Sequence, residues 1–234
     1  MTQSTPLTTA QARGMRSRSA ILDAAERLMG ENGYSATSMS TLAKESGLPV
    51  SSIYWHFVSK SGLLAAVLER GGRRFLSSAT PPDLNCPPDP LHRLRKMMEQ
   101  CVASMQQNAT FLRLFVSIML TATDKRDDNE AIAGVRGQAR KLLGKGFVWA
   151  YAEWGEQTAE YVSESLTGTA ATFLDGIFLA CQAGEETTGL IDRATTTLHA
   201  AAEVIRSTGS AIHGRPPRPV GPTAAQAEGD RPAD

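Results

Sequence analysis

Apolar residues recur every three or four positions through most of the chain, and this spacing predicts α-helices rather than strands. Four such stripes stand out. Their members are Ile21, Leu22, Ala25, Leu28 and Met29; Leu91, Leu94, Met98, Cys101 and Met105; Leu166, Ala170, Phe173, Leu174, Ile177, Phe178 and Cys181; and Leu190, Ala194, Leu198, Ala201 and Ile205. No segment alternates as a half-buried strand does, so the pattern predicts an all-α fold of about nine helices.

Proline divides the chain into parts. None of the twelve prolines lies between Leu91 and Arg215, whereas five fall within residues 81–90 and five more follow near the C-terminus. Proline interrupts helix interiors, so long helices are expected in the proline-free part. The same argument predicts a Pro-rich linker over residues 79–90. A disordered tail is expected over residues 210–234, which are rich in Pro, Gly and Ala.

Two short helical patterns follow one another near the N-terminus, separated by a glycine. Thr37 or Ser38 provides an N-cap for the first. Pro49 suits the first turn of the second, where its missing N–H costs nothing. Gly47 falls between them, where a tight turn needs a residue free to adopt positive φ.

Apolar residues give each of these short helices an inward face. They are Met39, Leu42 and Ala43 in the first helix and Ile53 and Phe57 in the second. A longer helix precedes the pair and ends at a C-cap at Gly33. Another follows an N-cap at Ser59 and continues through Leu63, Leu64, Val67 and Leu68. This is the arrangement of a helix-turn-helix, whose second helix enters the major groove of DNA.

The helix-turn-helix segment resembles the TetR family of bacterial regulators. The matching positions are Thr37-Ser38, Leu42-Ala43, Gly47-Leu48, Ile53-Tyr54-Trp55-His56-Phe57, Ser59-Lys60 and Leu63-Leu64. The resemblance covers about residues 15–70. The predicted parts are a flexible N-terminal arm (1–14), a helix-turn-helix DNA-binding domain (15–78), the linker (79–90), a helical effector-binding and dimerisation domain (91–209) and the tail (210–234).

The resemblance also implies a set of DNA contacts. Phosphate contacts fall to Thr37, Ser38, Tyr54, His56 and Lys60, and the positions that face bases or the flanking backbone are Val50, Ser51, Ser52 and Trp55. Pro49, where relatives frequently carry a capping serine, completes the set. Other interpretations stay open: the two aromatics as packing residues, the histidine as a structural hydrogen-bonding residue and the lysine as a solvated surface residue.

The recognition helix departs from many relatives in its chemistry. Residues 47–59 contain no Arg, Lys, Asn or Gln, so the strong bidentate base contacts are unavailable. Readout is therefore expected to use apolar contacts, hydroxyls and DNA shape. The charge distribution agrees with a polyanionic partner near the N-terminus. Residues 1–80 hold nine basic and five acidic side chains, whereas the remainder holds 15 and 19.

The C-terminal part is expected to sense a small molecule and to form a homodimer. Candidate pocket residues are Met98, Met105, Phe111, Phe115, Met119, Phe147, Tyr151 and Phe173. Candidate interface residues are Phe173, Ile177, Cys181, Leu198, Ala201 and Ile205. Either set is alternatively ordinary core. A symmetric dimer implies a roughly palindromic operator. Gly71-Gly72 is expected to interrupt the fourth helix and to let the two DNA-binding units change their separation.

Other classes of function find little support in the sequence. The four histidines are scattered without metal-ligand spacing, and no catalytic motif or cofactor motif is present, so neither an enzyme nor a metal site is predicted. The longest stretch without charged residues, residues 46–59, is too short to span a membrane. The odd number of cysteines (Cys86, Cys101 and Cys181) suits reduced thiols in the cytoplasm.

The predicted function is a sequence-specific DNA-binding regulator, a repressor that a small-molecule effector releases from its operator. Two alternatives stay open. One is an activator or a regulator controlled by a protein partner instead of a small molecule. The other is an all-helical enzyme or adaptor that has lost DNA binding.

Overall fold

A computed structural model describes residues 9–78, 89–121 and 126–209 of the 234-residue chain. Nine α-helices and one 3₁₀ turn lie in these ranges. They are α1 (Thr9–Asn32), α2 (Met39–Ser46), α3 (Val50–Phe57), α4 (Lys60–Ser78), α5 (Pro90–Gln107), α6 (Ala109–Thr121), α7 (Arg126–Ala150), η1 (Ala152–Trp154), α8 (Glu156–Gln182) and α9 (Thr188–Gly209). The all-α prediction is confirmed.

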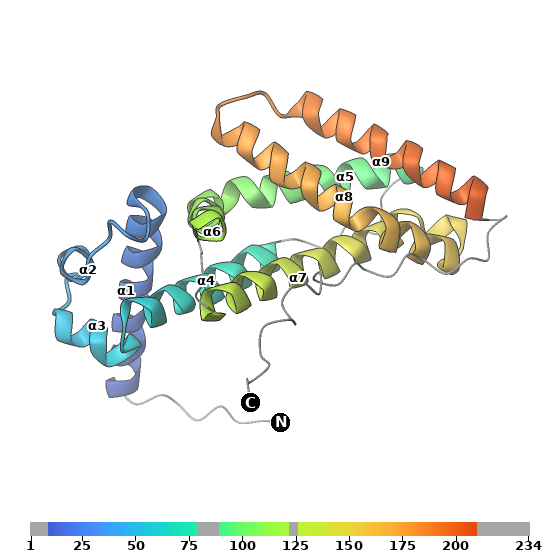
Figure 1. Cartoon of the computed structure of the whole chain (residues 1–234). Coiled ribbons are helices and arrows are strands. Elements are labelled where there is room, and N and C mark those ends of the chain that lie inside the picture. Colours follow the sequence, from blue (N-terminus) through green and yellow to red (C-terminus); the bar gives the residue numbers. More distant parts are fainter. Residues whose placement is uncertain (1–8, 79–88, 122–125, 210–234) are drawn as a thin grey trace, which may run out of the picture.

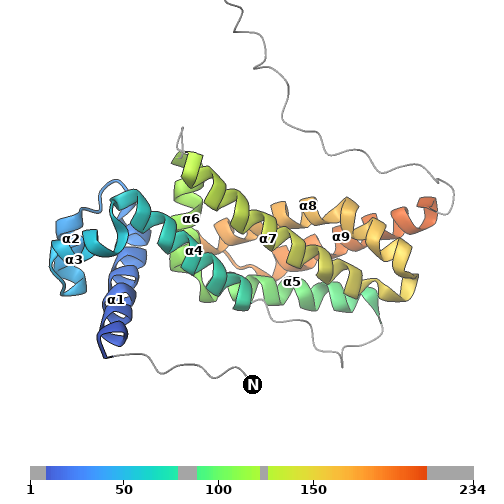
Figure 2. The same ribbon diagram turned by 90° about the horizontal axis from the view of Figure 1, so that it is seen from below.

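The helices form two groups that meet along α4, α6 and α7. Helices α1 to α3 lie at one end of the molecule, and α8 and α9 form an antiparallel pair toward the other, with α5 beside them (Figure 1). Helix α7 packs along α8 and also contacts α4, while α6 packs on α1. The view turned by 90° shows the same separation of the small N-terminal group from the larger helical layer (Figure 2).

Each group has its own apolar core. The first core joins α1 to α4 with α6 and includes Ile21, Leu42, Ile53, Leu64, Phe111 and Phe115. The second joins α5, α7, α8 and α9 and includes Met98, Phe147, Tyr151, Ile177 and Leu198. Met105 packs against both. The stripes read from the sequence therefore supply the buried faces of these helices.

Local signals in the sequence set several helix ends. Gly33 adopts φ 84° and its N–H donates to the carbonyl of Met29 at 3.0 Å, as a C-cap does. Asp89 caps α5 by accepting from the N–H of His92, with Pro90 as the first helical residue. The helix after the Pro-rich stretch thus begins one residue before the predicted boundary.

The predicted N-terminal arm overlaps a helix. Because α1 already begins at Thr9, residues 9–14 are helical, and the expected arm is wrong for them. Residues 1–8, most of the linker with Cys86, and the tail from residue 210 lie outside the described residues.

The expected break at Gly71-Gly72 is wrong. Helix α4 is continuous from Lys60 to Ser78, and both glycines are buried in it. A Cβ at Gly71 would lie 2.1 Å from the Phe111 ring, and one at Gly72 would lie 2.7 Å from the side chain of Val135. The glycines therefore let α6 and α7 approach the backbone of α4 closely.

The eight residues predicted to line an effector pocket are spread over both cores. Phe111 and Phe115 are buried in the first, and Met98, Phe147 and Tyr151 in the second. Met105 packs against both cores, Met119 against the first and Phe173 against the second, all partly buried. None of the eight lines either of the two surface hollows described below. An effector cavity among them stays a prediction.

Across the described ranges, no helix combines the length and the apolar character that crossing a membrane requires.

Candidate nucleic-acid interface

Helices α2 and α3 are joined by a tight glycine turn. Ser38 is the N-cap of α2, and its hydroxyl accepts from the N–H of Thr41 at 3.0 Å. Gly47 ends the helix in the left-handed region at φ 68°, and its N–H donates to the carbonyl of Ala43. Pro49 then stands as the N-cap of α3 without a side-chain cap bond. The turn predicted from Gly47 is confirmed.

Helix α3 has one buried face and one exposed face. Ile53 and Phe57, one turn apart, are buried in the first core. The rows Val50 with Tyr54 and Ser51 with Trp55 point outward, and the indole of Trp55 is 77% exposed. An exposed row of large apolar side chains on a short helix is costly in water and indicates a surface that meets a partner.

The start of α1 extends this exposed face. A hollow of about 470 Å³ lies between Arg13, Gly14 and Ser17 of α1 and Ser51, Ser52, Trp55 and His56 of α3. Arg13, Gly14 and Ser17 lie outside the set of DNA contacts that the resemblance implies. The sequence does contain a signal for this grouping: Arg13 and Ser17 are four residues apart, which puts their side chains on the same face of α1.

His56 lies partly buried between the exposed and buried faces of α3. Its ring contacts that of Trp55 edge-on, with centroids 4.6 Å apart. Burial, with the positive charge of Arg18 as a second cause, lowers the pKa of His56 below its usual value. Arg18 itself lies over the Phe57 ring. A lowered pKa favours the neutral imidazole at pH 7, which can make hydrogen bonds but carries no charge.

Lys60 begins α4 beside the turn that precedes α2. Its ammonium donates to the carbonyl of Ser35 at 3.3 Å and lies 4.5 Å from the centre of the Tyr34 ring. These contacts hold the charge near the N-termini of α2 and α4, where exposed N–H groups favour an anion. The ordered position is compatible with the phosphate contact that the resemblance implies.

Of the two hydroxyl residues before α2, only Ser38 faces solvent. Thr37 is 2% exposed, and its hydroxyl donates to the carbonyl of Gly33 at 2.9 Å. This hydroxyl closes the loop after α1, so only the backbone of Thr37 is left for the predicted phosphate contact, which stays a prediction. The predicted contact of Ser38 stays a prediction.

The chain leaves α3 through a strained residue. Val58 has φ 60° and ψ −43°, and the N–H of Ser59 donates to the carbonyl of Phe57 across it at 2.5 Å. Positive φ is unfavourable for a β-branched residue. Ser59 then caps α4 by accepting from the N–H of Gly62. This turn fixes the direction of α3 relative to α4.

The six residues predicted for a dimer interface divide into two groups. Ile177 and Leu198 are fully committed to the second core of the monomer. Phe173, Cys181, Ala201 and Ile205 are partly buried. Ile177 and Leu198 are buried within the monomer because α8 and α9 pack directly on each other.

Within residues 9–78, 89–121 and 126–209, no group of three or more His, Cys, Asp or Glu side chains is arranged to hold a metal ion. The N-terminal helices thus combine an exposed face on α3 with Lys60 held beside the turn before α2 and a partly buried His56.

Comparison with known proteins agrees with this geometry. Residues 21–67 match the family model of bacterial regulatory proteins of the tetR family. The HTH-type transcriptional regulator AcrR of Shigella flexneri is 36% identical over 81 residues, which are 35% of this chain and 38% of that protein. The HTH-type transcriptional repressor KstR of Rhodococcus jostii is 31% identical over 134 residues, which are 57% and 58%. These matches span less than two thirds of either relative.

Structural similarity extends over more of the chain. A TetR transcription regulator from Haloarcula marismortui has a TM-score of 0.61 and 22% identity, covering 81% of this chain and 98% of that one. At this identity the comparison shows the shared fold. The chain therefore has the fold of the TetR regulators, and its residues 21–67 match the family model of their DNA-binding region.

Proposed function

We propose that this protein is a homodimeric repressor that reads a palindromic operator through α3 and is released from it by a small-molecule effector. The exposed α3 face carries the proposal. Val50, Ser51, Tyr54 and Trp55 project from a helix whose opposite side is anchored in the core. This geometry suits insertion into a major groove. The name of the matched KstR, a repressor, supports the sign of regulation.

Readout by this helix rests on shape and apolar contact. Serine hydroxyls donate to or accept from several bases, and Val50 and Trp55 suit contact with a thymine methyl. The surrounding polar groups position the helix on the backbone: Ser38 and Lys60 near two helix N-termini, and Arg13 at the start of α1.

Dimerisation through α8 and α9 supplies the two-fold symmetry. Both helices keep an apolar residue at the surface, Leu179 at 55% and Val204 at 60% exposure. Small exposed residues accompany them and allow close helix approach; they are Gly168, Thr172 and Gly176 of α8 and Thr196, Thr197 and Ala200 of α9. A second copy of the same helix pair would complete a four-helix bundle.

Binding to the DNA upstream of the protein's own coding sequence tests the proposal. A fluorescent duplex of that region is titrated with full-length protein at several salt concentrations, beside a scrambled duplex. We expect selective binding that weakens steeply with salt. Trp55→Ala should weaken operator binding about tenfold. Lys60→Ala should weaken binding to both duplexes and reduce the salt dependence.

Matched controls are available away from the interface. Leu120→Ala removes another exposed apolar side chain, and Lys96→Ala removes another lysine on α5; neither should change affinity. Equal binding of operator and scrambled DNA by the wild type, repeated with duplexes from neighbouring genes, would overturn the proposal.

A further inference from the structure

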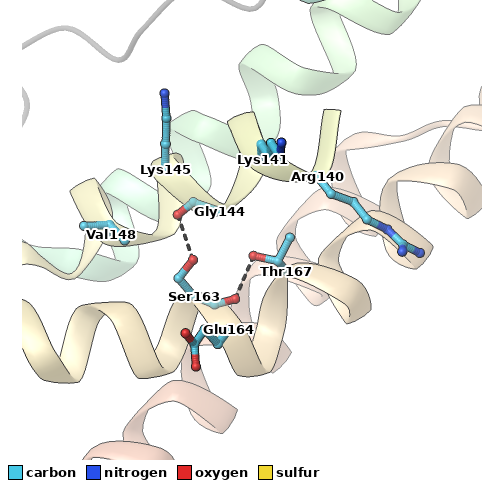
Figure 3. Close-up of a pocket in the computed structure, with 8 residues that line it drawn as sticks. All are labelled: Arg140, Lys141, Gly144, Lys145, Val148, Ser163, Glu164 and Thr167. Atoms are coloured by element: carbon cyan, nitrogen blue, oxygen red, sulfur yellow. Dashed lines mark hydrogen bonds between the residues drawn. The ribbon is translucent and has the colours of Figure 1, made fainter. Parts of the chain in front are cut away.

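A groove of about 600 Å³ lies between α7 and α8, and one of its lining residues, Val148, packs against the second core. It is lined by Arg140, Lys141, Gly144, Lys145 and Val148 of α7 and by Ser163, Glu164 and Thr167 of α8. Figure 3 shows Ser163 turned toward Gly144 and Lys145 extending outward from α7. A Cβ on Gly144 would lie 3.1 Å from the Ser163 hydroxyl oxygen, so the glycine keeps the floor of the groove open.

The groove carries an excess of positive charge. Its lining holds three cationic side chains, those of Arg140, Lys141 and Lys145, and one carboxylate, that of Glu164; all four are exposed. Within the described part of the chain, none of the three cations forms an ion pair. One turn away, the charges between α7 and α8 are balanced, because Arg136 donates to Asp175 at 2.8 Å.

The imbalance has a simple origin in the sequence of α8. Residues 165–174 contain no charged side chain, so α7 meets no acidic partner between Glu164 and Asp175. Three like charges on neighbouring turns repel one another and are left with only solvent to screen them. An anion in the groove would relieve that repulsion.

The hydroxyls of the groove are already used as donors. Ser163 donates to the carbonyl of Gly144 at 2.9 Å, and Thr167 donates to the carbonyl of Ser163 at 2.7 Å. Their oxygens therefore remain as acceptors, and the donors left for a ligand are the guanidinium and the two ammonium groups. Val148 adds an apolar contact.

We propose that this groove binds a small anion bearing carboxylate or phosphate groups. If this anion is the effector of the proposed function, the site gives the chemical class of that effector. Only this identification rests on the proposed function. The stretches of α7 and α8 that line the groove lie toward the end of the molecule opposite α3 (Figures 1 and 2). An anion bound there would leave the recognition face free and would act on DNA binding from a distance.

Calorimetric titration of the full-length protein tests the site. The probes are inorganic phosphate, pyrophosphate and citrate, with ionic strength held constant by sodium chloride, and choline chloride as the cationic comparison. We expect saturable binding of one anion per chain for at least one of the three anions and none for choline. Lys141→Gln should weaken binding about fivefold, and Glu164→Gln should tighten it about threefold, since each changes one charge in a half-open groove.

Two variants repeat these charge changes elsewhere. Lys96→Gln on α5 and Glu185→Gln after α8 should leave anion affinity unchanged. Thermal melts confirm that each variant is folded. Equal effects of groove and control variants, or no saturable binding of any anion, would overturn the proposal. The proposal would also be overturned if Lys141→Gln abolished the dimer or weakened binding to scrambled DNA. The groove would then serve a protein or nucleic-acid partner.

Operator affinity is measured separately without any anion. Anion binding with no operator binding would retain the site and reject the proposed function. Operator binding with no anion binding would retain the function and reject the site. If both occur, adding the bound anion should shift operator affinity in the wild type and about fivefold less effectively in Lys141→Gln at the same anion concentration.

Discussion

The guanidinium of Arg74 in α4 lies 2.5 Å from the carboxylate of Glu26 in α1. Glu26 is only 8% exposed as a side chain, and it also accepts from Arg70 at 3.2 Å. The same guanidinium donates through Nε to the amide oxygen of Asn108, at the junction of α5 and α6, at 3.1 Å. One arginine therefore joins the DNA-binding helices to the helical domain through a partly buried polar network.

Removing the charge of Glu26 should destabilise the protein. In Glu26→Gln, Arg70 and Arg74 lose their shared carboxylate, and we expect a loss of about 2 kcal/mol in the free energy of unfolding, reduced by the exposure of Arg74. Urea denaturation measures it. Asp23→Asn removes an exposed partner of Arg70 and should cost less than about 0.5 kcal/mol. Equal losses in the two variants would contradict a special role for the buried carboxylate.

Filling the space at Gly71 should also be costly. The added methyl of Gly71→Ala would meet the Phe111 ring, so we expect a loss of about 1–3 kcal/mol on urea denaturation. Gly137→Ala in α7 is the matched control, because nothing lies within 4 Å of its Cβ position, and it should gain about 0.5–1 kcal/mol. Partial recovery in Gly71→Ala combined with Phe111→Leu would identify the ring as the cause. If Gly71→Ala were neutral, the packing argument would fail.

The lowered pKa of His56 predicts a pH dependence of stability. The folded state favours neutral His56, so below pH 6.5 the unfolded chain binds this proton first and the free energy of unfolding decreases as the pH falls. Thermal melts from about pH 7.5 to about pH 5.5 should show a larger decrease in Tm for the wild type than for His56→Gln. Arg18→Gln, which removes the second cause of the shift, should lie between them. Parallel curves for all three proteins would count against this assignment.

Charge placed on the exposed side of α8 and α9 should separate the proposed dimer. Leu179→Glu and Val204→Glu each put a carboxylate where the second copy is expected to pack, and we expect at least about tenfold weaker self-association in sedimentation equilibrium. Leu120→Glu introduces the same charge at an exposed position on α6 and should leave the mass unchanged. A dimer that survives both α8 and α9 variants would place the interface elsewhere.

Local features of the fold could be predicted from the sequence because their causes are local. Spacing and conformational preference alone predict the helix ends at Gly33 and Gly47 and the inward positions of Ile53 and Phe57. Thr37 and Ser38 could not be separated in this way. Both carry a short hydroxyl, and only the course of the preceding loop decides which one caps α2 and which one turns inward.

Features that depend on residues distant in the chain could not be predicted from the sequence. The sequence around Gly71 suggests a helix break, because Phe111, which packs against this glycine, is forty residues away in the chain. An apolar stripe likewise does not show which surface covers it: the stripes suggest Ile177 and Leu198 for a dimer interface, whereas the monomer itself buries both. The groove between α7 and α8 exists only because Lys141 and Glu164 come from different helices that pack side by side.

The close contacts at Gly71 and Gly72 have a mechanical consequence. The side chains of Phe111 in α6 and Val135 in α7 pack closely against the backbone of α4 at two consecutive residues. This packing leaves little space for the helix to bend there. We therefore expect a small displacement of α6 or α7 to move α4 as a rigid helix. The N-terminal end of α4 is Lys60, next to the turn that follows α3, so we expect such a displacement to change the position of α3.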